Sequence, residues 1–165
     1  MIVLGVDPGT TVTGYGVVDR PVAGAARLVE CGVVRPLSGS PLAERLSALH
    51  EELAHIIARH RPDVIAIESI FVHRNARSAL VLGHARGVVL LAAHASGAHV
   101  AEYSPAVVKK TVTGSGSATK AQVASMVARL LRLRHAPRPA DAADGVAIAL
   151  THCMRTRALR RAVVG

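Results

Sequence analysis

The 165-residue sequence has only two cysteines, Cys31 and Cys153. They lie far apart and no second pair accompanies them, so the chain offers neither a disulfide framework nor a cysteine zinc site. In a reducing compartment both would stay thiols, and we expect small buried apolar side chains at both positions. The nine histidines are scattered without a spaced pair of the H-E-x-x-H kind, which argues against a histidine zinc site.

The sequence also lacks an uninterrupted apolar run of about 18 residues, the length that a membrane-spanning helix needs. The best candidate, Val88 to Ala93, is bounded by Arg86 and His94, and we expect it to be part of a core helix. No basic segment precedes the apolar N-terminus, which contains Asp7, so a signal peptide is not predicted. We therefore expect no membrane partner and a cytoplasmic location.

Acidic residues are few, with 11 Asp and Glu against 20 Lys and Arg, and the formal net charge is +9. Such a protein attracts polyanions, so nucleic acid is the first predicted partner and an anionic membrane surface the second. Half of the residues are apolar and 19% are charged, a composition typical of a folded chain. The length suits one domain, which we place at residues 1–157, with a short basic tail at residues 158–165.

Turn residues separate apolar segments whose spacing predicts the secondary structure. Alternating or β-branched residues predict five strands: 2–6, 12–18, 28–34, 64–67 and 99–103. Apolar stripes at helical spacing predict helices that begin after Ser40 as N-cap and end before Pro62, span 75–95 and 120–133, and begin at Pro105 and Asp141. This order predicts an α/β protein with a mixed five-stranded sheet flanked by helices.

The predicted helix at residues 75–95 is apolar on most of its circumference, so it must be covered on several sides. Ala79, Gly83 and Gly87 recur on it at four-residue spacing. Small residues at this spacing allow another backbone to approach closely, either from a partner or from the protein's own sheet. The sequence leaves both possibilities open.

Four carboxylates lie where apolar residues or helix starts are expected. Asp7 ends the first strand, Glu68 ends the fourth, and Asp141 and Asp144 lie three residues apart at the start of the last helix. A buried ionised carboxylate is costly unless a cation pairs with it. Alone, Asp7 before Pro8-Gly9 would be read as a turn residue and Asp141 as an N-cap, but the set of four favours a shared site.

Carboxylates from neighbouring strand ends and one helix would form an oxygen-rich site, which suits Mg²⁺ or Mn²⁺ and not zinc. Two such ions about 3.5–4 Å apart can activate water and stabilise the leaving oxygen in phosphoryl transfer. A basic protein with this site is a candidate nuclease.

Five segments together resemble one known family: V-D-P-G-T-T-V-T-G-Y-G at 6–16, I-E-S-I-F at 67–71, N-A-R-S-A-L at 75–80, G-S-G-S-A-T-K at 114–120, and D-A-A-D-G-V-A-I-A at 141–149. These segments cover nearly the whole chain and look like those of the RuvC family of Holliday junction resolvases. The resemblance implies a ribonuclease H-like nuclease domain at residues 1–157 and a homodimer. It also implies paired symmetric nicks in four-way junction DNA, in homologous recombination and DNA repair.

The resemblance further implies that Asp7, Glu68, Asp141 and Asp144 hold two Mg²⁺ ions, with Mn²⁺ able to substitute, and that a RuvA–RuvB branch-migration complex is a partner. Lys109 and Lys120 match basic positions of the family that bind backbone phosphate, although a solvated helix face is the alternative. Phe71 matches an aromatic that stacks on a junction base, and core packing is its alternative. We also expect Arg74, in the polar stretch that follows, to contact DNA.

Two rival functions remain. The D-P-G-T-T segment also resembles the phosphate-binding hairpin of actin-like kinases and chaperones, which need a second domain around ATP. A non-catalytic DNA-binding module, in which the carboxylates only order loops, is the other. Measurable ATP binding would favour the first, and DNA products that do not depend on divalent metal would favour the second.

Overall fold

A computed structural model of the chain describes residues 1–22, 24–69 and 76–164, of which residues 76–78 and 157–164 are described by their backbone alone. The strands are β1 (Ile2–Asp7), β2 (Thr13–Asp19), β3 (Arg27–Val34), β4 (Val64–Glu68) and β5 (His99–Tyr103). The helices are α1 (Leu42–His60), α2 (Ala76–Ser96), α3 (Pro105–Thr113), α4 (Lys120–Leu130) and α5 (Ala140–Val164). The predicted order of elements is therefore confirmed.

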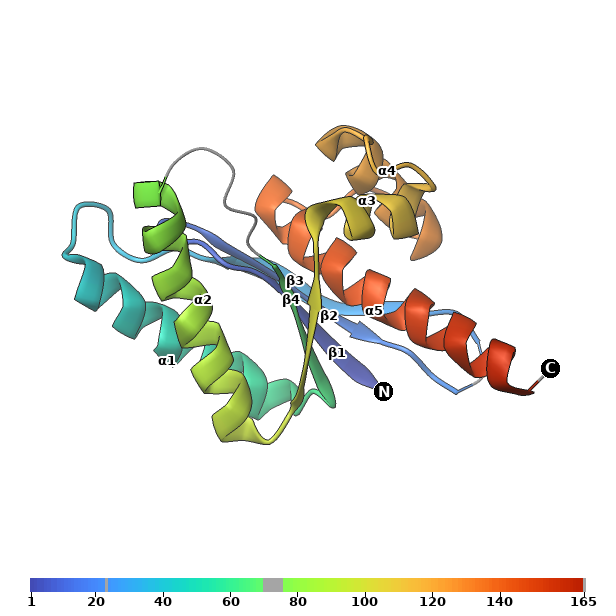
Figure 1. The fold of residues 1–165 in the computed structure, drawn as a ribbon, viewed down its shortest axis with the longest axis horizontal. Coiled ribbons are helices and arrows are strands. Elements are labelled where there is room, and N and C mark those ends of the chain that lie inside the picture. The colour runs from blue at the N-terminus through green and yellow to red at the C-terminus, as the bar shows by residue number, and fades with distance from the viewer. Residues whose placement is uncertain (23, 70–75, 165) are drawn as a thin grey trace.

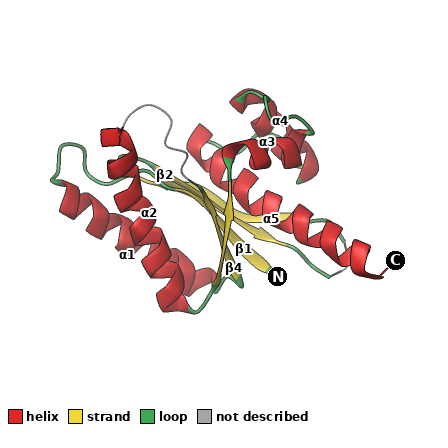
Figure 2. Ribbon diagram, in the orientation of Figure 1, coloured by secondary structure: helices red, strands yellow, loops and turns green. Residues whose placement is uncertain are grey.

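The five strands form one mixed sheet in the order β3-β2-β1-β4-β5. β1, β2 and β3 pair antiparallel, whereas β4 is parallel to β1 and β5 is parallel to β4. Helices α1 and α2 cover one face of the sheet, and α3, α4 and α5 cover the other (Figures 1 and 2). The mixed five-stranded α/β sheet that the sequence predicts is thus present.

Strand alternation decides which side chains reach each face, because successive residues point to opposite sides of a sheet. Leu4 and Val6 of β1 pack in the core with α1 and α2. Val3 packs in the core with α5. Asp7 follows this alternation onto the α5 face, and Glu68 of β4 does the same. The parallel register Val6↔Ile67 makes these two acids neighbours at the same end of the sheet.

Helix α5 packs directly on β1 and β2, and glycines on the sheet allow this. A Cβ atom added at Gly16 would meet the backbone of Val146, and one added at Gly14 would meet the backbone carbonyl of Asp141. From the helix side, a Cβ at Gly145 would lie 2.5 Å from the Cα of Tyr15. These glycines bring the first turns of α5, with Asp141 and Asp144, against the strand that follows Asp7.

Some boundaries differ from the prediction. Ser40 does not cap α1: Pro41 holds the N-cap position, and the Ser40 hydroxyl donates to the carbonyl of Leu37, 2.8 Å away, in the preceding turn. Helix α4 ends at Leu130 and not at Leu133, because Arg132 adopts a left-handed conformation (φ 55°). Helix α5 runs to Val164, and the division into a domain at 1–157 and a basic tail at 158–165 stays a prediction.

Helix α2 is covered on one side only by the rest of the described chain. Ala85, Val89, Ala92 and Ala93 are buried against α1 and the sheet, while Leu91 is 60% exposed. By length and composition alone the segment Ala79–Ser96 could cross a membrane, although Arg86 and two histidines interrupt its apolar run as the sequence indicates. Such a helix is weak evidence for a membrane span, and Arg86 within it pairs with Glu102 of β5 at 2.5 Å.

Candidate active site

Three of the four predicted carboxylates line one cavity at the end of the sheet. Asp7 at the end of β1, Glu68 at the end of β4 and Asp144 on α5 surround a space of about 190 Å³. The side chains that complete its wall belong to α3, α4 and α5: Pro105, Val108, Lys109, Lys120, Val123 and Ala147. Residues that are far apart in the sequence are therefore brought together as the pattern of acids predicts.

Lys120 pairs with one of these carboxylates. Its Nζ lies 2.6 Å from Oδ2 of Asp144, and the hydrogen bond from the ammonium to this carboxylate raises the pKa of Lys120. Lys120 is held at the first residue of α4 by a capping box, in which the Thr119 hydroxyl accepts from the backbone of Gln122 and the Gln122 side chain accepts from the backbone of Thr119. A helix start thus fixes a lysine beside the acids.

The acids raise each other's pKa. Burial, followed by the charge of Asp144, raises the pKa of Asp7 from 3.8 to about 6. Burial, followed by the charge of Asp7, raises the pKa of Glu68 from 4.5 to about 7. Lys120 lowers both pKa values, and Lys109 lowers that of Glu68, but neither effect outweighs burial and repulsion. The cavity therefore holds more negative potential than its own lysines neutralise.

Asp141 lies at the edge of this arrangement. It is in the first turn of α5, half-buried, and it does not line the cavity. Its negative charge still contributes to the raised pKa of Asp7, although less than that of Asp144. The structure therefore brings Asp7, Glu68 and Asp144 together and leaves Asp141 one turn away.

The turn after Asp7 is closed by its own hydrogen bonds. The buried hydroxyl of Thr13 donates to the carbonyl of Gly9 at 2.7 Å and accepts from the N–H of Gly9 at 3.1 Å. Because these groups are used within the turn, they are not free to bind a nucleotide phosphate. The turn serves instead to end β1 firmly, with Asp7 as its last residue.

The carboxylates of the cavity offer oxygen donors to a divalent cation. Among the residues that the structure describes, no group of three or more Asp, Glu, His or Cys side chains is already arranged to hold a metal ion. The chemistry nevertheless fits a hard cation, because the cavity offers carboxylate oxygens from three elements and its two strand-end acids have raised pKa values. The predicted cage is thus a set of facing carboxylates, not a closed ligand shell.

The remaining predicted site residues divide into two groups. Lys109 of α3 and Lys120 of α4 both line the cavity, so neither belongs to a helix face turned away from it. Phe71 and Arg74 lie outside the described residues. The structure adds residues that the sequence argument missed, namely the turn-closing Thr13 and the glycines Gly14 and Gly16. The alternation of these glycines on one face of β2 is the signal that could have identified them.

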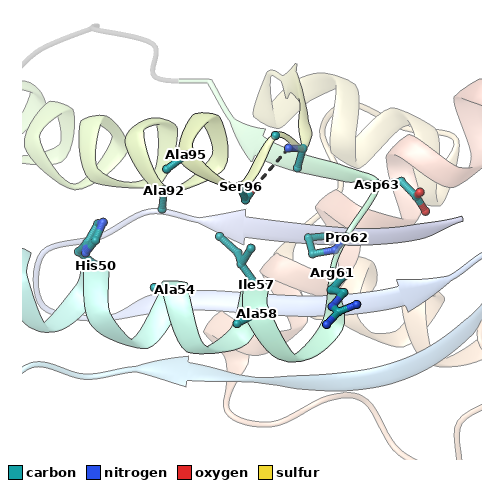
Figure 3. Close-up of a pocket in the computed structure, with 12 residues that line it drawn as sticks. His50, Ala54, Ile57, Ala58, Arg61, Pro62, Asp63, Ala92, Ala95 and Ser96 are labelled. Atoms are coloured by element: carbon teal, nitrogen blue, oxygen red, sulfur yellow. Dashed lines mark hydrogen bonds between the residues drawn. The ribbon is translucent and has the colours of Figure 1, made fainter.

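A second, larger cavity lies away from the acids. It measures about 780 Å³ and lies between α1 and the C-terminal end of α2 (Figure 3). Pro62 and Asp63 precede β4 and Ala98 precedes β5, so this cavity is at the opposite end of the parallel strands from Glu68. Asp63 is already bonded, since its carboxylate accepts from the N–H of Ile2 at 2.6 Å. Of these two cavities, the carboxylate cavity is therefore the one that gathers acids from several elements.

Comparisons with known proteins identify nucleases as relatives of this chain. The family model described as "Crossover junction endodeoxyribonuclease RuvC" matches residues 3–152. Among curated proteins, the chain is 51% identical over 152 residues to that enzyme from Pelotomaculum thermopropionicum, covering 92% of each chain. It is 53% identical over 152 residues to that from Halorhodospira halophila, covering 91% of this chain and 88% of the relative.

Solved structures agree with the fold. The Thermus thermophilus RuvC structure superposes with a TM-score of 0.87 at 41% identity, covering 95% of this chain and 96% of that one. The same enzyme in complex with Holliday junction substrate gives 0.86 at 39% identity, with the same coverage. The yeast mitochondrial resolvase Ydc2 shares the fold alone, with a TM-score of 0.65 at 14% identity. The chain therefore belongs to the RuvC family of crossover junction endodeoxyribonucleases, nucleases of ribonuclease H-like fold.

Proposed function

We propose that this protein binds four-way (Holliday) junction DNA and resolves it by paired, symmetric nicks, in homologous recombination and DNA repair in the cytoplasm. The observation that carries the proposal is the cavity in which Asp7, Glu68 and Asp144 face Lys109 and Lys120. This arrangement joins a site for hard cations to a site for phosphate. A RuvC relative of 39% identity and the same fold has been solved with Holliday junction substrate.

The proposed cofactor is a pair of Mg²⁺ ions, for which Mn²⁺ substitutes. Asp7, Glu68 and Asp144 would hold them, and Asp141 would contribute from the first turn of α5. When bound, the ions supply an activated water and stabilise the leaving oxygen of the phosphodiester. The excess negative potential behind the raised pKa values of Asp7 and Glu68 supports this assignment.

Lys109 and Lys120 would bind DNA and not the cations. Lys109 and Lys120 present ammonium groups to the cavity from two helices, and we assign both to the phosphates that flank the cleaved bond. An ammonium binds phosphate as a point charge, so this contact positions DNA without selecting a base sequence. The pairing with Asp144 holds the charge of Lys120 beside the site before DNA binds. To bind phosphate, Lys120 has to leave this pairing.

We assign the exposed face of α2 to the dimer that symmetric cutting needs. A hollow of about 790 Å³ on this face is lined by Ala79, Leu80, Gly83, His84, Gly87, Val88 and Leu91. Among the described residues, a Cβ atom added at Gly83 or Gly87 would meet nothing within 4 Å. The described chain thus gives no packing role for these glycines on its own sheet, which supports approach by a partner, the other possibility that the sequence leaves open.

Three further assignments rest on the sequence alone. Phe71 would stack on a base at the branch point, and Arg74 would bind DNA beside it. A branch-migration complex of the RuvA–RuvB kind would be the protein partner.

Neither the actin-like nor the non-catalytic alternative has an observation in its favour, because the Gly9 N–H is already bonded within its turn and the relatives are named endonucleases.

The test is cleavage of a synthetic four-way junction with Mg²⁺, beside a linear duplex that contains the same sequences. We expect paired nicks at symmetric positions of the junction, no product from the duplex, and no product from either DNA in EDTA. Cutting of the linear duplex at a similar rate would contradict the junction proposal. Equal products with and without metal would contradict the assignment of the carboxylates.

A further inference from the structure

A tyrosine and a histidine bond to each other on the α5 face of the sheet, behind the carboxylate cavity. The hydroxyl of Tyr103, the last residue of β5, lies 2.9 Å from Nδ1 of His152 on α5. The two rings meet edge to face, with centroids 6.0 Å apart and an interplanar angle of 63°. His152 is 9% exposed and Tyr103 is half-buried. Neither residue lines the cavity, so their role is not direct contact with its contents.

The backbone of Tyr103 also holds the strand end that carries Glu68. Tyr103 is the register partner of Glu68 in the parallel pairing of β4 with β5. The N–H of Ser69, the next residue, donates to the carbonyl of Tyr103 at 2.9 Å. One residue therefore fixes the chain immediately after Glu68 through its carbonyl and reaches α5 through its side chain.

On the helix side, His152 lies eight residues after Asp144, which is about two turns of α5. The intervening helix is buried, since Ala147, Ile148 and Thr151 are at most 1% exposed. The Tyr103–His152 contact thus connects β5, which is bonded to the chain just after Glu68, to α5, which carries Asp144. We refer to this contact as the β5–α5 bridge.

The bridge is a bond between neutral groups. A tyrosine hydroxyl donates to Nδ1 only when the imidazole is neutral and carries its proton on Nε2. Burial raises the pKa of Tyr103 and lowers that of His152, to which the charge of Arg20 adds, so both groups stay neutral near pH 7. Neither group therefore has to lose its neutral form to keep this bond near pH 7.

We propose that the β5–α5 bridge sets the separation between Glu68 and Asp144 and thereby the affinity of the site for a divalent cation. Tyr103 and His152 are positioning residues, and the inference rests on the proposed function because it takes Glu68 and Asp144 as metal ligands. Mg²⁺ demands near-ideal octahedral geometry, so small changes in the separation of two carboxylates weaken its binding. Groups behind the ligands commonly tune metal affinity in this way.

The test compares Mn²⁺ binding to the full-length protein without DNA, followed by the loss of the free-ion signal in electron paramagnetic resonance. Tyr103→Phe removes only the hydroxyl and is expected to weaken Mn²⁺ binding about three- to tenfold, the effect of one net hydrogen bond. Thr151→Val is the matched control, because it also removes a buried hydroxyl, but one that bonds within α5 to the carbonyl of Ala147 at 2.8 Å. We expect this control to bind Mn²⁺ like the wild type.

Rescue distinguishes the bridge from general packing. His152→Asn keeps an acceptor near the position of Nδ1 and is expected to retain Mn²⁺ affinity, whereas His152→Leu should match Tyr103→Phe. The double variant Tyr103→Phe with His152→Leu should be no weaker than either single variant, since both remove the same bond. Circular dichroism and melting temperature confirm that each variant is folded.

Three outcomes would overturn the inference. Wild-type Mn²⁺ affinity in Tyr103→Phe would overturn it alone and leave the proposed function intact. An equal loss in the Thr151→Val control would do the same, because it would assign the effect to loosening of α5. A wild type that binds no more Mn²⁺ than Asp7→Asn would overturn the metal-site assignment itself, and this inference with it.

Discussion

The fold makes the carboxyl groups of Asp7 and Glu68 harder to ionise than the free side chains. Their pKa values rise to about 6 and about 7 because burial and the neighbouring carboxylates penalise ionisation. At neutral pH the folded protein without metal therefore carries an electrostatic cost at the site where a cation would remove it. Pre-formed negative potential of this kind is what a metal-binding site requires.

This cost makes stability depend on pH with a definite sign. The folded pKa values of Asp7 and Glu68 lie above their ordinary values of 3.8 and 4.5, so the folded state binds more protons. The contribution of Asp7 and Glu68 to the free energy of unfolding is therefore fully present below about pH 4, and it is lost as the pH rises through 6 and 7. In EDTA at pH 8 we expect Asp7→Asn to melt higher than the wild type, by a stability difference on the order of 1–3 kcal/mol.

Thermal melts across this pH range provide the measurement. At pH 4 the two proteins should melt together, because Asp7 is then protonated and uncharged, and Mg²⁺ at pH 8 should stabilise the wild type but not the variant. A wild type that is more stable than Asp7→Asn in EDTA at pH 8 would show that Asp7 is compensated within the fold and needs no cation.

The same substitution separates chemistry from binding. Asp7→Asn removes a carboxylate charge from the cavity but no lysine, so we expect cleavage of the junction to fall at least about a hundredfold while binding stays within about twofold of the wild type. Cleavage is measured with Mg²⁺, and binding with Ca²⁺, whose looser coordination suits phosphoryl transfer poorly. Near wild-type cutting by Asp7→Asn would remove Asp7 from the metal site.

At the scale of elements, the sequence predicted the strands and helices well because each has a clear period and clear turn residues. Asp7 and Glu68 were identified as strand ends because β1 and β4 are apolar up to the residue before the acid. The N-cap of α1 was wrong, since a serine before a proline carries the same local signal whether it caps the helix or closes the preceding turn. The conformation of the turn from Leu37 to Ser40 decides between these two roles of the serine.

The alternation of Gly14 and Gly16 marks a close approach to β2, but the element that makes this approach could not be predicted from local pattern. Gly14 and Gly16 look like weak strand residues, and their purpose depends on a helix that lies more than a hundred residues later in the chain. For the same reason Asp141 and Asp144 look equivalent in sequence, although only Asp144 lines the cavity. Their spacing places both acids on one face of the helix. The way in which α5 packs across the sheet decides which of the two lines the cavity.

This packing gives a prediction at the same scale. Gly16→Ala should lower stability by about 1–3 kcal/mol, because the new Cβ meets the backbone of Val146 and α5 has to move away. Mn²⁺ affinity should fall as well, since α5 carries Asp144. Gly116→Ala is the control, because among the described residues its Cβ would meet only the carbonyl of Ala106, at an ordinary contact distance of 3.7 Å. Equal effects of the two substitutions on melting temperature would contradict the packing argument.

At the scale of the whole molecule, the face of α2 remains uncovered by the described chain. Leu80 and Leu91 are 67% and 60% exposed on either side of the glycines. We predict that Gly83→Leu disrupts a dimer without disturbing the fold, because the described residues of the single chain leave open space at this position and leucine favours a helix. Light scattering should show a monomer with unchanged circular dichroism, whereas a Gly83→Leu variant that remains dimeric would place the interface elsewhere.

The last prediction joins the dimer to the chemistry. In the single chain, β1, β4, α3, α4 and α5 supply all the described side chains that line the carboxylate cavity, so we expect each protomer of the proposed dimer to hold its own set of acids. A dimer of one wild-type and one Asp7→Asn protomer, isolated by two different affinity tags, should therefore nick a four-way junction on one strand only. The junction would stay joined, and a denaturing gel would show one labelled strand cut while a native gel shows no resolved duplexes. Wild-type dimers should yield resolved duplexes and dimers of two variants no cut, so paired nicks from the mixed dimer would show that one site serves both strands.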